Sequence, residues 1–160
     1  MLTSDDLQAY LRQHAVAATI LHLANETPTV PAAAAALGVS AAQIVKSVLF
    51  LVDARPWLVV AAGTARVSRR KLATHLGVGR KRPKLATADQ VLAWTGYPAG
   101  TVPPFGHPTP LPTLIDSGIT THALLFAGGG AHNGMMRIAR DELLRVLDAP
   151  LVGLVEDAPG

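Results

Sequence analysis

The chain contains no cysteine and few aromatic residues. Without cysteine, disulfide bonds, thiolate zinc sites and cysteine nucleophiles are excluded. Aromatic residues make up 4% of the sequence, charged residues 16% and hydrophobic residues 49%. The core must therefore be built mainly from Ala, Val, Leu and Ile, and the hydrophobic fraction is large enough to form one. The length predicts a single domain over residues 1–160.

The signature motifs of several enzyme classes are also missing. The histidines show no H-E-x-x-H spacing, and with no thiolate present a metal site is not predicted. No G-x-S-x-G elbow supports a serine hydrolase, and no G-x-G-x-x-G follows a predicted strand, as a dinucleotide-binding fold requires. We therefore expect no metal and no cofactor. A hydrolase built on this chain would rely on water or on the substrate itself as the nucleophile.

Long apolar segments that could cross a bilayer are absent as well. The first residues, 1–6, end in two aspartates and lack the basic and apolar regions of a signal peptide. The longest uncharged stretches are interrupted by prolines and glycines, so none is predicted to span a membrane. We expect a cytoplasmic protein without a membrane partner.

Positive charge is in excess in the middle of the chain. The net charge is only +3, but more than half of the 14 Lys and Arg residues fall in one segment, and no acidic residue lies between Asp53 and Asp89. A block of one sign is typical of a protein with a polyanion partner. It is equally typical of a solvated basic face. The block consists of Arg66, Arg69, Arg70, Lys71, Arg80, Lys81, Arg82 and Lys84.

Capping signals and hydrophobic periodicity predict a mixed α+β fold. Helices are expected over residues 4–14, with Ser4 as the cap, and over 31–37, 40–45, 68–76, 87–94 and 140–147. Strands are expected over residues 17–23, 46–52, 57–62, 111–116, 123–127, 135–139 and 151–154. Arg55-Pro56 is expected to form a hairpin turn. Because strands outnumber the long helices and are often joined by short turns, the sheet should be mixed.

Lys46 is unusual because it lies inside an apolar run, Ile44-Val45-Lys46-Ser47-Val48-Leu49-Phe50, at the start of a predicted strand. A charge in such a run is costly unless its side chain faces a cleft or a partner. In a cleft, a lysine can hold a phosphate or a carboxylate. The alternative is a lysine whose stem covers apolar surface while its ammonium group reaches water.

Two glycine-rich segments could contribute to a binding pocket. Residues 96–107 combine glycines, which expose backbone N–H groups, with prolines, which stiffen the loop. Such a loop is suited to hold a carbonyl oxygen or an oxyanion, although an ordinary surface loop is the alternative. Residues 127–134 carry three successive glycines followed by His132 and Asn133. They could form a bulge, a turn or the wall of a pocket.

Taken in order, these segments resemble the YbaK/EbsC and ProXp family of free-standing editing proteins, which are related to the editing domain of bacterial prolyl-tRNA synthetases. The resemblance covers nearly the whole chain, and the order and spacing of its pieces are fairly specific. It rests on residues 7–11, 29–39, 43–50 and 69–72, on the loop 96–107, and on residues 127–129 before 136–138.

The resemblance implies an α+β fold with a mixed, largely antiparallel sheet curled into a barrel-like core and surrounded by helices. It implies a deacylase that hydrolyses the ester between a small, wrongly attached amino acid and the 3′ end of a tRNA, of the tRNA-Pro type or similar. The attacking group would be water or a group of the substrate. A prolyl-tRNA synthetase is a candidate second partner.

The resemblance also assigns roles to individual residues. Catalytic roles would fall to Lys46, Gly100 and Thr101, with the lysine on the terminal nucleotide and the loop backbone facing the scissile carbonyl. The basic block, from Arg66 to Lys84, would meet the acceptor stem. Substrate binding would involve Val102, Pro103, Gly106, His107, Gly128, Gly129 and His132.

Three hypotheses follow from the sequence. The first, which we favour, is an aminoacyl-tRNA deacylase. The second is a non-catalytic module that binds tRNA or a synthetase through the same basic face. The third is a small-molecule pocket protein without RNA contact, against which the basic block argues.

Overall fold

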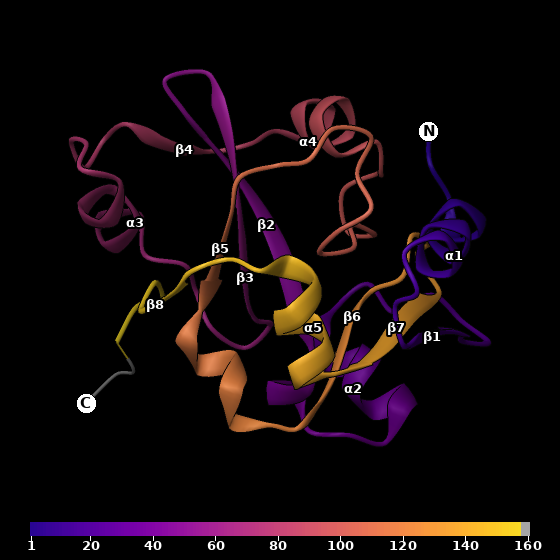
Figure 1. The fold of residues 1–160 in the computed structure, drawn as a ribbon. Helices are drawn as coiled ribbons and strands as arrows, with labels where there is room; N and C mark the ends of the chain where they lie inside the picture. Colours follow the sequence, from indigo (N-terminus) through magenta and orange to yellow (C-terminus); the bar gives the residue numbers. More distant parts are fainter. Residues whose placement is uncertain (158–160) are drawn as a thin grey trace.

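The computed structural model describes residues 1–157 and arranges them as two β-sheets with helices around them (Figure 1). The three-stranded sheet has the order β1–β7–β6 and is antiparallel. The five-stranded sheet has the order β4–β2–β3–β5–β8, with antiparallel pairing of β2 to β4 and β3 and parallel pairing of β5 to β3 and β8. The strands are β1 (Ala18–His22), β2 (Val45–Val52), β3 (Arg55–Ala62), β4 (Pro83–Leu85), β5 (Thr113–Asp116), β6 (Leu124–Gly128), β7 (Gly134–Ala139) and β8 (Leu151–Val152).

The two sheets meet where β2 begins. An isolated parallel bridge joins Ile44, just before β2, to Phe126 in β6. Within residues 1–157 the sheets do not close into a barrel. The predicted α+β fold with mostly antiparallel pairing is therefore confirmed, whereas the barrel-like closure implied by the resemblance is not found.

Helices cover the edges and ends of the sheets. In Figure 1, α3 and β4 lie on one side of the β2–β3 hairpin and α1 lies on the other, while α2 lies at the end of β2 that is opposite to the hairpin turn. Among residues 1–157, no helix combines the length and the apolar character needed to cross a bilayer. The helices are α1 (Ser4–Gln13), α2 (Val30–Leu37), α3 (Arg69–Leu76), α4 (Ala88–Thr95) and α5 (Arg140–Leu147), with short 3₁₀ turns η1 (Ala41–Gln43) and η2 (Ser117–Thr121).

Local capping explains where several helices begin. The Ser68 hydroxyl accepts the N–H of Lys71 at 3.1 Å and opens α3, as predicted. The predicted start at Ser4 is off by one residue. Thr3 is the cap, because the carboxylate of Asp6 accepts the Thr3 N–H at 2.7 Å and completes a capping box.

The predicted hairpin turn at Arg55-Pro56 is wrong. Val52 pairs with Arg55, so the turn consists of Asp53 and Ala54, whose φ angles are 52° and 64°. A two-residue hairpin turn of this kind needs positive φ at both central positions. Pro56 lies within β3, outside the part of the strand that pairs with β5, so its missing N–H costs no bond to that neighbour.

Two short elements also differ from the prediction. The helix expected over residues 40–45 is only the 3₁₀ turn η1, and Val45 already belongs to β2. The β-branched side chains of Ile44 and Val45 favour the extended backbone there. Strand β4 was not predicted, because three residues that include a proline and a lysine show no alternating pattern. The core itself is aliphatic, as composition predicts, with residues 58–61 of β3 fully buried.

Candidate active site

A small cavity lies at the junction of the two sheets. Its volume is about 210 Å³, and it is bounded by the start of β2, the segment leading into α2, the Gly/Pro-rich loop and the ends of β6 and β7. Four residues singled out in the sequence line this cavity together, namely Lys46, Gly100, Val102 and Gly128. They come from three segments that are far apart along the chain, so only the fold brings them together.

Gly128 allows the two glycine-rich segments to meet. A Cβ atom at this position would overlap with the backbone carbonyl of Val102. The neighbouring Gly130 donates its N–H to the carbonyl oxygen of Thr101 at 2.9 Å, which ties the two segments together. Gly129 packs against residue Gly134, where an added Cβ would lie 2.6 Å from the carbonyl carbon. Gly128 and Gly130 therefore hold the glycine-rich segment against residues 101–102 at the wall of the cavity, while Gly129 packs within its own turn.

Lys46 enters the cavity without a counterion. The ammonium group forms no ion pair with any carboxylate of residues 1–157, and the cavity lining includes no acidic residue. Burial lowers the pKa of Lys46 from its ordinary value because removing water disfavours the charged form. An unpaired cation in a partly dry site attracts an anionic group of a ligand.

The backbone N–H groups of the Gly/Pro-rich loop differ in whether they are already hydrogen-bonded within the protein. Thr101 donates both its N–H, at 3.1 Å, and its hydroxyl, at 2.8 Å, to the carbonyl oxygen of Pro98. Within the part of the chain that the structure describes, the N–H groups of Gly100 and Val102 have no protein acceptor. Gly100 takes a φ of +86°, which suits glycine. The Thr101 amide is thus used inside the loop, while its two neighbours remain free to bind a ligand.

Pro103, Gly106 and His107 brace the loop rather than line the cavity. The Nε2–H of His107 donates to the carbonyl oxygen of Pro103 at 2.9 Å. Burial lowers the pKa of His107 and outweighs the opposing effect of this hydrogen bond. Gly106, with a φ of +82°, packs against the ring of Tyr10. These residues stabilise the conformation of the loop that lines the cavity, and they do not line the cavity themselves.

His132 lies at the mouth of the site. Its ring comes within 3.9 Å of the position that a Cβ on Gly100 would occupy. Its carbonyl oxygen accepts the N–H of Thr27 at 3.3 Å, which places the segment before α2 next to the glycine turn. The His132 side chain is exposed and does not belong to the cavity lining.

Most of the lining was not predicted. The wall opposite the loop comes from the segment before α2 and the start of that helix, and these residues carry no local sign of function. Ser47 is the most informative of the missed residues, because its hydroxyl is buried and has no hydrogen-bond partner within residues 1–157. Its only signal was its place beside Lys46. The missed residues are Thr27, Pro28, Thr29, Val30, Ala33, Ile44, Val45, Ser47 and Met135.

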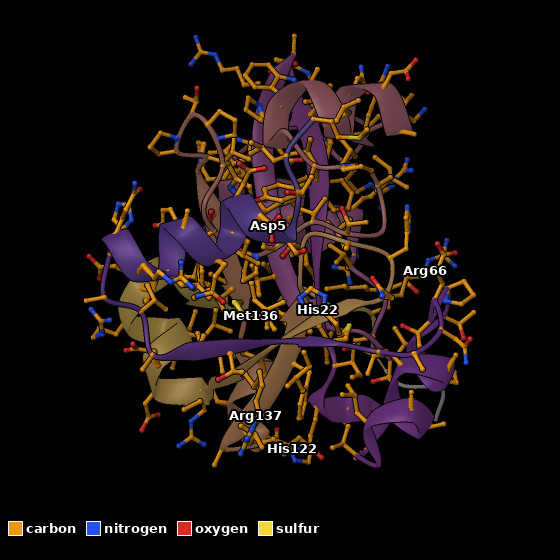
Figure 2. All side chains as sticks on the ribbon, turned by 90° about the vertical axis from the view of Figure 1, so that its right-hand side faces the viewer. Asp5, His22, Arg66, His122, Met136 and Arg137 are labelled. Carbon is orange, nitrogen blue, oxygen red and sulfur yellow. The ribbon has the colours of Figure 1, made fainter. Side chains whose placement is uncertain are left out.

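The fold divides the basic block into two groups. The first, Arg66 to Lys71, lies at the start of α3, and two of its cations meet carboxylates: Arg66 faces Glu156 at 3.8 Å and Lys71 binds Asp157 at 2.9 Å. Figure 2 shows Arg66 at the outer edge of the molecule. The second group, Arg80 to Lys84, lines a separate and larger cavity beside the hairpin turn.

Side chains that could hold a metal ion do not cluster in the described residues. No three His, Asp or Glu residues of 1–157 come together as a metal site would require. The polar groups at the cavity are instead a lysine, hydroxyls and backbone amides. Such a set can bind an anion and stabilise a developing negative charge on oxygen.

The chain belongs to the aminoacyl-tRNA editing domain family, whose match covers residues 24–146. The resemblance to YbaK-type editing proteins is thereby confirmed. A solved structure of a candidate trans-editing enzyme for prolyl tRNA synthetase superposes with a TM-score of 0.87 at 30% identity, covering 96% of this chain and 97% of that one. The crystal structure of a hypothetical protein, APE2540, gives a TM-score of 0.86 at 29% identity and covers 94% and 99% of the two chains.

Curated relatives include both large ligases and a protein of similar length. The proline–tRNA ligase of Nitratidesulfovibrio vulgaris strain DP4 is 40% identical over 78 residues, which is 49% of this chain but only 13% of the ligase. The chain therefore matches a small part of such a ligase. The uncharacterized protein YwhH of Bacillus subtilis is 28% identical over 120 residues and 74% of each chain.

Proposed function

We propose that this protein hydrolyses the ester of a small amino acid wrongly attached to tRNA, and that the reaction takes place in the cavity of Lys46 and Gly100. The observation that carries the proposal is that one small cavity is lined by an unpaired, half-buried cation and by two residues, Gly100 and Val102, whose backbone N–H groups have no acceptor within residues 1–157. This arrangement suits an anchored phosphate or ribose and a carbonyl that becomes an oxyanion.

The loop amides act on the carbonyl oxygen. When water or a group of the substrate attacks the carbonyl carbon, the C–O double bond opens and negative charge moves to the oxygen. The N–H groups of Gly100 and Val102 are available to stabilise this charge. The oxyanion then collapses, the bond to the ribose oxygen breaks, and that oxygen takes up a proton. That proton balances the one lost by the nucleophile. With water as the nucleophile, the products are the free amino acid and the tRNA hydroxyl. With a group of the substrate as the nucleophile, the tRNA hydroxyl leaves together with a cyclic ester or thioester, which water then opens to the free amino acid.

Lys46 holds the substrate in the orientation for this attack. Its ammonium group has no protein counterion within residues 1–157, so the negative charge must come from the ligand. The phosphate of the terminal nucleotide carries such a charge. Because the lysine is partly desolvated, its attraction to the phosphate is stronger than that of an exposed cation.

The cavity restricts the amino acid to a small one. Its volume of about 210 Å³ is below the roughly 300 Å³ at which ordinary ligand pockets begin. The walls contributed by Val30, Ala33 and Met135 are apolar. Alanine, serine, cysteine and threonine are the side chains we expect to fit, whereas aromatic amino acids should be excluded by overlap with these walls.

The basic block supplies the long-range attraction for the nucleic acid. Its cations lie outside the cavity. They can therefore bind the phosphates of a polyanion, but they do not contact the ester that reacts. The similarity to proline–tRNA ligases makes tRNA-Pro the RNA to test first and a prolyl-tRNA synthetase a candidate partner.

A panel of charged tRNAs tests the proposal. The released amino acid is measured with the wild-type protein and compared with spontaneous hydrolysis of the same tRNA. We expect release of at least one small amino acid from tRNA-Pro and no release of phenylalanine. Binding of every charged tRNA without any release above the spontaneous rate would contradict the proposal and favour the non-catalytic module.

A further inference from the structure

A second cavity lies at the far end of β2 from Lys46. Its volume is about 850 Å³, and it is bounded by the hairpin turn, by β4 and by the start of α4. We call it the basic groove, because its lining includes Arg80, Lys81, Arg82 and Lys84. Figure 1 shows the hairpin turn, β4 and α4 together at one end of the molecule, with α2 at the other.

The cations of the basic groove are largely unpaired. Asp53 is the acidic residue of the lining, and its carboxylate is taken by Arg82 at 2.7 Å. Arg80, Lys81 and Lys84 form no ion pair within residues 1–157. The groove also contains apolar surface, since the side chain of Leu85 is 54% exposed. Unpaired cations above an apolar floor suit the phosphates and sugars of a nucleic acid backbone.

The first group of cations offers a weaker site. The segment after β8 brings Glu156 and Asp157 against Arg66 and Lys71. Lys71 also donates to the carbonyl oxygen of Val155 at 2.8 Å, so its ammonium group is already engaged. A polyanion that approached these residues would have to compete with two carboxylates, which reduces the gain from counterion release.

The distance between the two cavities along β2 is comparable to the length of a stacked single strand at the 3′ end of a tRNA. From Lys46 to Leu51, which lines the basic groove, β2 extends five residues or ~17 Å at the usual rise per residue. Because side chains alternate along a strand, these two side chains lie on opposite faces of the sheet, and β2 sets only the distance along its axis. This distance equals about five stacked nucleotides at ~3.4 Å each. It exceeds the short unpaired 3′ end of a tRNA and reaches the first phosphates of the paired stem.

We propose that the basic groove binds the sugar-phosphate backbone of the paired acceptor stem while the unpaired 3′ end extends past the segment from Thr87 to Val102 into the cavity of Lys46. The segment from Thr87 to Val102 borders both cavities, with Thr87 and Gln90 at the groove and Gly100 at the cavity. The cations from Arg66 to Lys71 make no contact with the stem and add only to the long-range attraction. This assignment rests on the proposed function, because the proposed function places the 3′ end of the tRNA in the cavity of Lys46.

Two double variants separate the two groups of cations. Arg80→Ala/Lys84→Ala removes two exposed cations of the groove, and Arg69→Ala/Arg70→Ala removes two exposed cations of the first group. Arg12→Ala/Arg137→Ala is the matched control, because both arginines are exposed and lie outside the block. Binding of an uncharged acceptor-stem hairpin RNA with its unpaired 3′ end is measured by fluorescence anisotropy over about 50 to 200 mM salt.

The groove variant should weaken hairpin binding about tenfold and reduce the slope of log Kd against log salt by about 2. The other two variants should remain within about twofold of the wild type. Equal losses in the Arg69→Ala/Arg70→Ala variant, or no loss in the groove variant, would overturn the assignment. So would a groove variant that keeps RNA binding but loses binding to a prolyl-tRNA synthetase, because the partner would then be a protein.

A shorter substrate gives a second, independent readout. A charged oligonucleotide that contains only the unpaired 3′ end cannot reach the groove, so its deacylation should be the same in the groove variant and the wild type. A loss on this short substrate would overturn the assignment. Failure of the proposed function is distinguishable, because the wild type would then release no amino acid although hairpin binding still depends on the groove.

Discussion

The two ends of β2 present opposite kinds of surface. At one end a lone lysine shares a cavity of about 210 Å³ with apolar side chains and free amides. At the other end four cations surround a groove of about 850 Å³. A single charge acts strongly when water is excluded, whereas exposed charges are screened beyond about 10 Å and must act in number. The narrow end is therefore suited to chemistry and the wide end to holding a polyanion.

The largest expected effect is the loss of deacylation when the cation at the narrow end of β2 is removed, compared with removal of a cation at the wide end. Lys46→Ala should lower kcat/KM for deacylation by about 10²–10³-fold, because it removes the partly desolvated contact to the substrate. Lys84→Ala removes the same charge at the wide end and should raise KM while leaving kcat unchanged. Steady-state kinetics on one charged tRNA measures both. Equal effects of the two variants on kcat would contradict the assignment of the chemistry to the narrow end and of binding to the wide end.

The next effect concerns the backbone contact that shapes the narrow end. Gly128→Ala should lower the free energy of unfolding by about 3 kcal/mol, because its Cβ would overlap with the Val102 carbonyl. Gly153→Ala is the control, since an added Cβ there meets nothing within 4 Å. Urea unfolding of both variants provides the measurement. A Gly128→Ala protein as stable as the control would mean that the two glycine-rich segments are not in close contact.

A smaller effect of opposite sign is expected at Ser47. Its buried hydroxyl has no partner within residues 1–157, so Ser47→Ala should raise the free energy of unfolding by about 1 kcal/mol. Ser68→Ala should lower it by about 1 kcal/mol, because the Ser68 hydroxyl caps α3. If the substrate completes the hydrogen bonding of Ser47, the more stable variant will also be the slower enzyme. Loss of stability in Ser47→Ala would show that the hydroxyl is satisfied.

The smallest effect is a pH dependence of stability from His107. Burial lowers its pKa in the folded protein below the ordinary 6.5, so the unfolded chain binds the proton more readily. Stability from this residue is therefore present above pH 6.5 and is lost as the pH falls through the lowered folded pKa. His107→Gln should flatten the curve of unfolding free energy below about pH 6.5, where the wild-type protein loses stability.

The sequence pointed to the residues of the candidate site whose local sequence context is unusual. Lys46 was found because a charge interrupts an apolar strand, and Gly100 because glycine and proline alternate in one long loop. The structure places both on one cavity. The capping signals of α3 and α4 and the whole span of α5 were also predictable, since they depend on neighbouring residues only.

The rest could not be predicted because it depends on distant contacts. Thr27 and Met135 line the cavity, but nothing local distinguishes them from other loop and core residues. The Thr101 amide faces its own loop, which only the turn geometry reveals. The basic block looked continuous in sequence, yet α3 separates its two groups and the carboxylates after β8 meet only one of them.

The most direct measurement of the central claim is an NMR titration with an amide-linked 3′-alanylamino-adenosine, an analogue of the substrate end that cannot be hydrolysed. If the cavity of Lys46 is the site, the amide resonances of Gly100 and Val102 will shift in a saturable manner, and the shifts will be lost in Lys46→Ala. Shifts confined to the basic groove, or no shift at Gly100 and Val102 at saturation, would contradict the account.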